Sequence, residues 1–107
     1  SRSSLAARNS LALCLYELGD PAAAEALWRE SGEADQRAPQ RDARPALSAL
    51  KSLATLYRHQ KRLDEALAAA QELVARTRPD DPTYAGRAQL LSEIEKARTE
   101  PPKPGAP

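Results

Sequence analysis

The sequence predicts an all-α fold in which antiparallel helix pairs stack as a helical solenoid, and two observations support this prediction. The first is the stretch from Ser52 to Val74, where apolar residues recur at helical spacing, stop at a polar run over 58–62 and then resume. This pattern is typical of helix, short turn and helix. The second is that the same pattern occurs 42 residues earlier, and an internal repeat of this length indicates a solenoid. The corresponding pairs are Leu11 and Leu53, Leu15 and Tyr57, Gly19 and Lys61, and Ala24 and Ala66.

The first repeat unit has clear start and stop signals. Leucines at helical spacing predict a first helix over about 3–18, and Gly19 is expected to end it because glycine readily adopts the left-handed conformation of many helix C-termini. Asp20 and Pro21 favour a new helix start, since the carboxylate can accept from free amides and a proline at the first position loses no hydrogen bond. We therefore expect a second helix over about 21–36.

The second repeat unit follows a segment with no apolar period. Residues 35–44 contain Pro39 and are predicted to form a polar loop. Asp42 is the expected cap of a third helix over about 45–60, and the polar turn after it leads into a fourth helix over about 63–76.

The end of the chain divides into a helix and a tail. After a turn at 79–82, a fifth helix is predicted over about 82–98, with a charged outer side, and we expect it to cap a right-handed solenoid. The last eight residues include four prolines and one glycine, so we expect a disordered tail over 100–107 beyond a helical domain over 1–99. The tail has the form of a polyproline ligand, and an inert linker is the alternative interpretation.

The charge balance argues against a nucleic-acid partner. The 107 residues include 16 basic and 15 acidic side chains, for a net charge of +1, whereas a duplex-binding protein needs a surplus of positive charge. No apolar run is long enough to predict membrane insertion, and no signal-peptide pattern opens the sequence. The single cysteine, Cys14, cannot form an intrachain disulfide and fits a reducing compartment, so we expect a cytoplasmic protein.

The sequence offers no set of residues for catalysis. His59 is the single histidine, and no Asp or Cys stands at catalytic spacing on an adjoining turn. One histidine supplies neither a catalytic dyad nor a metal ligand set. We therefore expect no enzyme activity, no metal and no cofactor.

The repeated positions resemble the tetratricopeptide repeat. That family carries a leucine, an aromatic residue or leucine one turn on, a small residue at the turn, an alanine early in the second helix, an aromatic residue, and a proline between repeats. The matching residues are Leu11, Leu15, Gly19, Ala24 and Trp28 in the first unit and Leu53, Tyr57, Ala66 and Pro79 in the second. The spacing looks most like the long-period subtype of kinesin light chains, although Lys61 stands where glycine is usual and Ala70 where an aromatic residue is usual. By its place in the pattern, Trp28 is expected in the core.

The resemblance implies a scaffold or adaptor module that binds a peptide or partner segment in a concave groove lined by the first helix of each pair. Carried over to this sequence, the groove residues are Asn9, Leu13, Tyr16, Lys51, Thr55, Arg58, His59 and Gln89. Lys51, Thr55 and Arg58 also share one helix face by spacing, so this face is polar and mildly basic. Lys51 and Arg58 would pair an acidic side chain and Asn9 the ligand backbone. The alternative interpretation is an ordinary solvated helix face.

A second function is structural. The first helix has no preceding helix to cover Leu5 and Leu11, and each unit of a solenoid buries its face against its neighbours. We therefore expect either the C-terminal end of a longer solenoid or a homodimer through the first helix. In this case the chain serves self-association or assembly, and the groove is empty.

Overall fold

The computed structural model describes residues 5–37 and 43–100, without the side chains of Leu5, Ala6 and Gln36. Within these ranges the chain forms five α-helices and no strand, which agrees with the predicted all-α class. The helices are α1 (Leu5–Glu17), α2 (Pro21–Arg37), α3 (Arg44–His59), α4 (Leu63–Arg76) and α5 (Tyr84–Thr99). The predicted Pro-rich tail, which begins at Glu100, lies outside the described residues from 101 onward.

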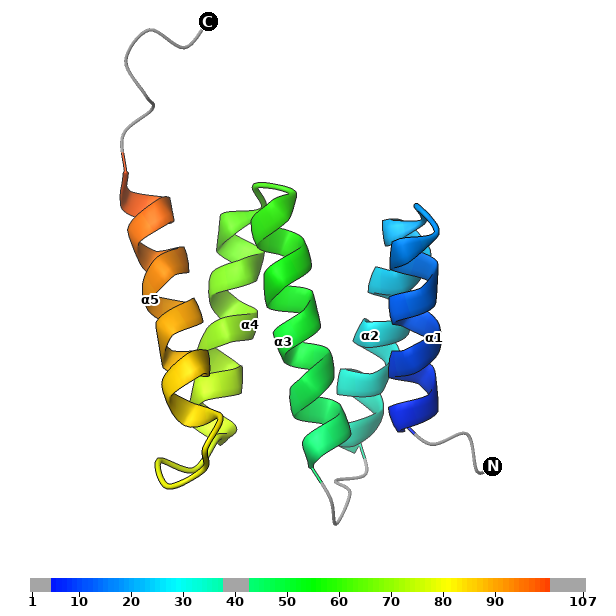
Figure 1. Cartoon of the computed structure of the whole chain (residues 1–107), viewed down its shortest axis with the longest axis horizontal. Coiled ribbons are helices and arrows are strands. Elements are labelled where there is room, and N and C mark those ends of the chain that lie inside the picture. Colours follow the sequence, from blue (N-terminus) through cyan, green and yellow to red (C-terminus); the bar gives the residue numbers. More distant parts are fainter. Residues whose placement is uncertain (1–4, 38–42, 101–107) are drawn as a thin grey trace, which may run out of the picture.

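The helices stand side by side in chain order, with α1 at one end and α5 at the other (Figure 1). Each helix packs against the next one, and α1 also contacts α3. The two tight turns, between α1 and α2 and between α3 and α4, join antiparallel helices into pairs. The third helix therefore lies between neighbours, whereas the first is covered on fewer sides.

The two turns have the same hydrogen-bond pattern at the 42-residue offset. The Gly19 amide donates to the Tyr16 carbonyl at 3.1 Å, and the Lys61 amide donates to the Arg58 carbonyl at 3.1 Å. Both turn residues have positive φ, 92° for Gly19 and 63° for Lys61. The predicted left-handed end of the first helix is confirmed. Lys61 adopts the same conformation at a position where glycine would do so without strain.

The core repeats in the same register. Ala12 and its counterpart Ala54 are fully buried, as are Ala24 and Ala66. Trp28 is buried, which confirms its predicted place in the core, and its counterpart Ala70 is also fully buried. Because alanine side chains hold little volume, the helices can approach closely, and the indole of the first unit fills space that no aromatic residue fills in the second.

The second helix is longer than predicted. It continues one residue further, to Arg37, so Asp35, where the predicted helix over 21–36 and the predicted loop over 35–44 overlap, belongs to the helix. The Asp35 carboxylate is almost completely buried and accepts a hydrogen bond from the Arg76 guanidinium at 2.6 Å. This contact with α4 gives the end of α2 a tertiary partner.

Helix starts vary in how well the sequence predicted them. Asp20 caps α2 as expected, since its carboxylate accepts from the Ala23 amide at 3.2 Å. Asp42, the expected cap of the third helix, lies outside the described residues, and the residue before α3 is Ala43, with no side-chain cap. The fifth helix begins two residues later than predicted because Asp81 accepts from both the amide and the hydroxyl of Thr83, at 2.8 and 2.6 Å, which extends the turn.

The fifth helix closes the described stack through one buried residue and several polar contacts. Ile94 is fully buried in the core. Arg58 of α3 pairs with Glu93 at 2.9 Å, and Arg98 pairs with Asp64 of α4 at 2.6 Å. None of the five described helices combines the length and apolar character that a membrane span requires.

Candidate functional site

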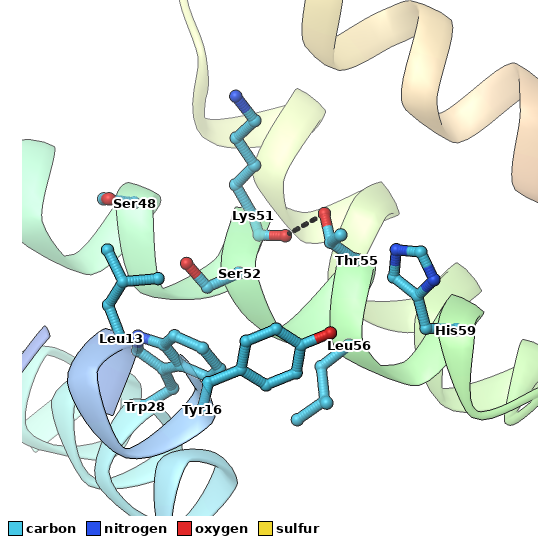
Figure 2. A pocket seen from close by; sticks show the side chains of 9 residues that line it. All are labelled: Leu13, Tyr16, Trp28, Ser48, Lys51, Ser52, Thr55, Leu56 and His59. Carbon is cyan, nitrogen blue, oxygen red and sulfur yellow. Dashed lines mark hydrogen bonds between the residues drawn. The ribbon is translucent and has the colours of Figure 1, made fainter. Parts of the chain in front are cut away.

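A pocket of about 350 Å³ lies between α1 and α3 (Figure 2). Nine residues line it: Leu13, Tyr16, Trp28, Ser48, Lys51, Ser52, Thr55, Leu56 and His59. The two helices that supply most of these residues are the first helices of the two repeat units. The internal repeat therefore places this pocket by setting the two helices beside each other.

One wall of the pocket is apolar and comes mainly from the first helix. The side chains of Leu13 and Tyr16 are 50% and 38% exposed, so they present apolar surface to the pocket. The ring of Tyr16 lies against the buried indole of Trp28, with centroids 6.3 Å apart and planes tilted by 49°. A tilted aromatic pair of this kind is a favourable arrangement. The wall is thus held in place before any ligand arrives.

The opposite wall is polar and comes from the third helix. Its residues follow one another at helical spacing along one face: Ser48, Lys51, Ser52, Thr55 and His59. The Thr55 hydroxyl donates to the Lys51 carbonyl at 2.9 Å, which fixes that side chain on the helix. The Lys51 ammonium extends from the helix surface in Figure 2, and the lining contains no carboxylate. The pocket therefore carries a positive charge that its own lining does not neutralise.

The structure brings together five of the eight predicted groove residues. Leu13, Tyr16, Lys51, Thr55 and His59 line the pocket, whereas Asn9, Arg58 and Gln89 do not. The Asn9 amide donates to the Pro45 carbonyl at 2.7 Å and so joins α1 to the start of α3.

Arg58 and Gln89 meet on a carboxylate of the fifth helix. Arg58 pairs with Glu93 at 2.9 Å, and the Gln89 amide donates to the same carboxylate at 3.0 Å. The Gln89 hydrogen bond, aided by the charge of Arg58, lowers the pKa of Glu93. These two predicted groove residues therefore share Glu93 as their partner and do not line the pocket.

Four lining residues are not among the eight predicted groove residues, and one of them, Ser52, lies beside Lys51 on the polar face of α3. Ser48 lies one turn before Lys51 and Ser52 on the same face of α3, so helical spacing alone carries the signal that could have found it. Trp28 and Leu56 are buried core residues whose edges reach the pocket. No signal in the sequence separates such residues from the rest of the core.

The densest ion-pair network of the described residues lies between α2 and the turn before α4, outside this pocket. Arg62 donates to Glu25 and to Glu65, each at 2.8 Å, and its guanidinium lies 4.5 Å from the ring centre of Tyr57. The hydrogen bonds from Arg62 lower the pKa of Glu25 and of Glu65, while burial raises the pKa of Tyr57. This network joins the two repeat units on a surface distinct from the pocket.

The chemistry of the pocket is that of recognition. It offers an ammonium group, hydroxyl groups, one imidazole and an apolar wall. Among the described residues, no group of three or more His, Cys, Asp or Glu side chains is placed to hold a metal ion. The arrangement can receive a side chain with an apolar body and place an anionic group near Lys51.

Comparison with known families matches residues 3–78 to the tetratricopeptide repeat. The matched range includes α1 to α4 and covers more than half of the chain. No curated protein and no solved structure matches the chain.

Proposed function

The chain belongs to the tetratricopeptide repeat family, and from this premise we propose that it binds a peptide or a partner segment in the pocket between α1 and α3. Repeats of this family generally mediate protein–protein interaction and are typically not enzymes. The observation that carries the proposal is the pairing of an apolar wall on α1 with a polar wall on α3 that lacks carboxylates. An ordinary solvated helix face would account for the polar wall on α3 but not for the apolar wall on α1.

The ligand that fits these walls has an apolar side chain next to an acidic one. The apolar side chain packs against Leu13 and Tyr16, and the acidic group pairs with Lys51. Arg58, which the sequence suggested as a second cation for the ligand, already pairs with Glu93 at 2.9 Å. Lys51 is therefore the main source of charge complementarity in the proposed complex.

Several finer features belong to the same proposal. The 42-residue offset, repeated in both turns, supports assignment to the long-period subtype that includes kinesin light chains. Exposed Glu95 and Lys96 on the fifth helix support its role as the cap of the solenoid, and the right-handed sense of the solenoid belongs to the same proposal. A cytoplasmic adaptor role is consistent with a sequence whose single cysteine cannot form an intrachain disulfide.

The proposal is tested by selecting peptides from a displayed random library on the 107-residue chain and measuring their binding by fluorescence anisotropy. Selected peptides should be acidic. Lys51→Glu should weaken their binding at least about tenfold, since it replaces an attractive charge with a repulsive one.

The matched control for this experiment is Lys96→Glu, the same substitution at an exposed position on the fifth helix. It should leave the affinity unchanged. Equal loss of binding in the two variants, or the selection of no peptide at all, would contradict the proposal.

The second candidate function is self-association through the first helix, with the pocket empty. It is favoured by a specific observation: Leu11 and Leu18 of the first unit are 54% and 81% exposed. Leu5, which the sequence placed on the same uncovered face, has a side chain outside the described part of the structure. Under this alternative, Lys51→Glu changes no interaction of the protein.

A further inference from the structure

The first helix carries a second apolar surface on the side that the pocket does not use. Ala7, Leu11 and Cys14 lie on one face of α1 by their spacings of four and three residues. Leu18, just after the end of the helix, follows four residues later, and its amide donates to the Cys14 carbonyl at 2.9 Å. All four are exposed. We call them the α1 stripe. The pocket instead uses Leu13 of this helix, together with Tyr16.

The second repeat unit shows what such a stripe does when it is covered. The residues of α3 in the same register are Ala49, Leu53, Leu56 and Gln60. The first three are buried, in a helix that packs against both α2 and α4. This face of the first helix in a pair is therefore an interface face, and in α1 it lacks the covering that α2 gives to α3.

The two stripes differ at their fourth position. Gln60 is polar and exposed, so a helix that covers α3 does not need to extend to it. Its counterpart Leu18 is apolar and 81% exposed. The exposed apolar surface of the first unit thus continues one turn beyond the residues that are buried in α3. A preceding repeat unit that covered α1 as α2 covers α3 would leave Leu18 exposed, which favours a different occupant.

The order of sizes along the α1 stripe makes it complementary to itself. From one end it reads small, large, small, large: Ala7, Leu11, Cys14, Leu18. When a second copy is turned end for end, each small residue meets a leucine. When two copies run parallel, leucine meets leucine and alanine meets alanine, which packs less evenly.

We infer that the α1 stripe is covered by a second copy of this chain, with the two first helices antiparallel and centred between Ala12 and Leu13. In this register Leu11 lies beside Cys14 of the partner subunit, and Leu18 lies beside Ala7 of the partner subunit. The inference rests on the second candidate function and does not depend on the pocket.

The polar residues beside the stripe are compatible with this register. Ser10 and Glu17 lie on one flank of the stripe by helical spacing. In the antiparallel pair, Glu17 falls near Ser10 of the partner subunit, and the two Glu17 carboxylates are about 13 Å apart along the helix axis. The register therefore brings no like charges into contact.

One helix pair gives a small interface. Stable protein complexes bury roughly 1,600 Å² in total, and two short stripes provide less than that. We therefore expect an equilibrium between monomer and dimer that depends on concentration, with a dissociation constant sensitive to each stripe leucine.

The first test is a dilution series by analytical ultracentrifugation. The substitution Leu18→Gln gives α1 the residue found in the same register of α3, and it should raise the dimer dissociation constant about tenfold or more, since a leucine is lost from each end of the interface. The matched control is Leu13→Gln, the same change at a half-exposed leucine of the same helix outside the stripe. It should leave the constant unchanged, and circular dichroism checks that both variants remain helical.

A wild-type chain that stays monomeric at every accessible concentration would overturn the inference, as would equal weakening by the two variants. Anisotropy with a pocket-binding peptide separates this result from the fate of the proposed pocket. Leu18→Gln should leave such binding intact, because Leu18 does not line the pocket.

The second test determines orientation by thiol cross-linking. In a Cys14→Ser background, one variant carries Ala7→Cys and another carries Leu18→Cys, and each is treated with a short bismaleimide alone and as a mixture. Covalent dimers confined to the mixture support the antiparallel register. Dimers within each single variant indicate a parallel pair and overturn it, as does the absence of covalent dimers in all three samples.

Discussion

The two repeat units carry the same pattern but differ in how much of it they bury. Leu11 is 54% exposed, whereas its counterpart Leu53 is 6% exposed, and Leu15 is half-buried where Tyr57 is buried. The reason is position: α3 packs against both α2 and α4, while α1 packs mainly against α2 and to a lesser extent against α3. In a repeat protein, burial is therefore decided by the neighbours of a unit and not by the unit itself.

The units also reuse one register position to join successive helices. Asp35, near the end of α2, and Thr77, just after α4, are counterparts and are both buried. Asp35 accepts from Arg76 of α4 at 2.6 Å, and the Thr77 hydroxyl accepts from Arg87 of α5 at 3.0 Å. The same position thus receives an arginine from a later helix in each unit, through a charged acceptor in one and a neutral acceptor in the other.

The largest expected effect tests the difference in burial directly. Leu53→Ala should reduce the free energy of unfolding by about 2–5 kcal/mol, because it leaves a cavity in the core. Leu11→Ala should reduce it by less than about 1 kcal/mol, since half of that side chain is already in water. Urea denaturation at low protein concentration, where any dimer is dissociated, measures both. Similar losses for the two variants would show that α1 is as well covered as α3.

The next effect concerns the two turns, where the residue differs but the backbone does not. Gly19→Ala should destabilise the fold by about 1–2 kcal/mol, because alanine is strained at a φ of 92° even though nothing lies within 4 Å of its Cβ. Lys61→Gly should stabilise it by up to about 1 kcal/mol by relieving strain at a φ of 63°. Thermal denaturation of both variants gives the two signs, and shifts of the same sign would contradict this account.

The smallest effect concerns Glu25 of the first repeat unit, which accepts a hydrogen bond from Arg62 of the second unit. The counterpart of Glu25 in the second unit is the apolar Leu67. The pKa of Glu25 is lowered below the ordinary value of 4.5, chiefly by the hydrogen bond from Arg62. A lowered pKa adds stability above 4.5, and this stability is lost as the pH falls through the folded-state pKa. Glu25→Gln should therefore be less stable than the wild type by roughly 1 kcal/mol or less at neutral pH, with a gap that closes in acid.

Unfolding by urea from pH 7 to pH 3 measures this gap. Glu30→Gln, at an exposed position of the same helix, is the matched control. A gap for Glu25→Gln that stays constant across the range would argue that its carboxylate does not gain stability from Arg62.

Much of the candidate site could be predicted from the sequence because its polar wall follows one helix. Lys51, Thr55 and His59 share a face by spacing alone, and the structure places all three on the pocket. Arg58 and Gln89 were assigned to the same groove but meet on Glu93, which is 35 residues away from Arg58 in the chain. Gln89 and Glu93 are four residues apart on α5, so spacing could have paired them, whereas the partner of Arg58 lies on another helix and could not be identified from spacing.

The sequence by itself determined the repeat, the two turns, the cap at Asp20 and the bounds of α4, because these depend on local periodicity and on hydrogen bonds between residues close in the chain. The tertiary structure alone decided that Asp35, near the end of α2, is buried and paired with Arg76, which lies 41 residues further along. It also decided that Trp28 reaches the pocket and that Leu11 remains exposed. The physical reason is that periodicity reports which side of its own helix a residue occupies, whereas burial and pairing depend on which other helix stands against that side.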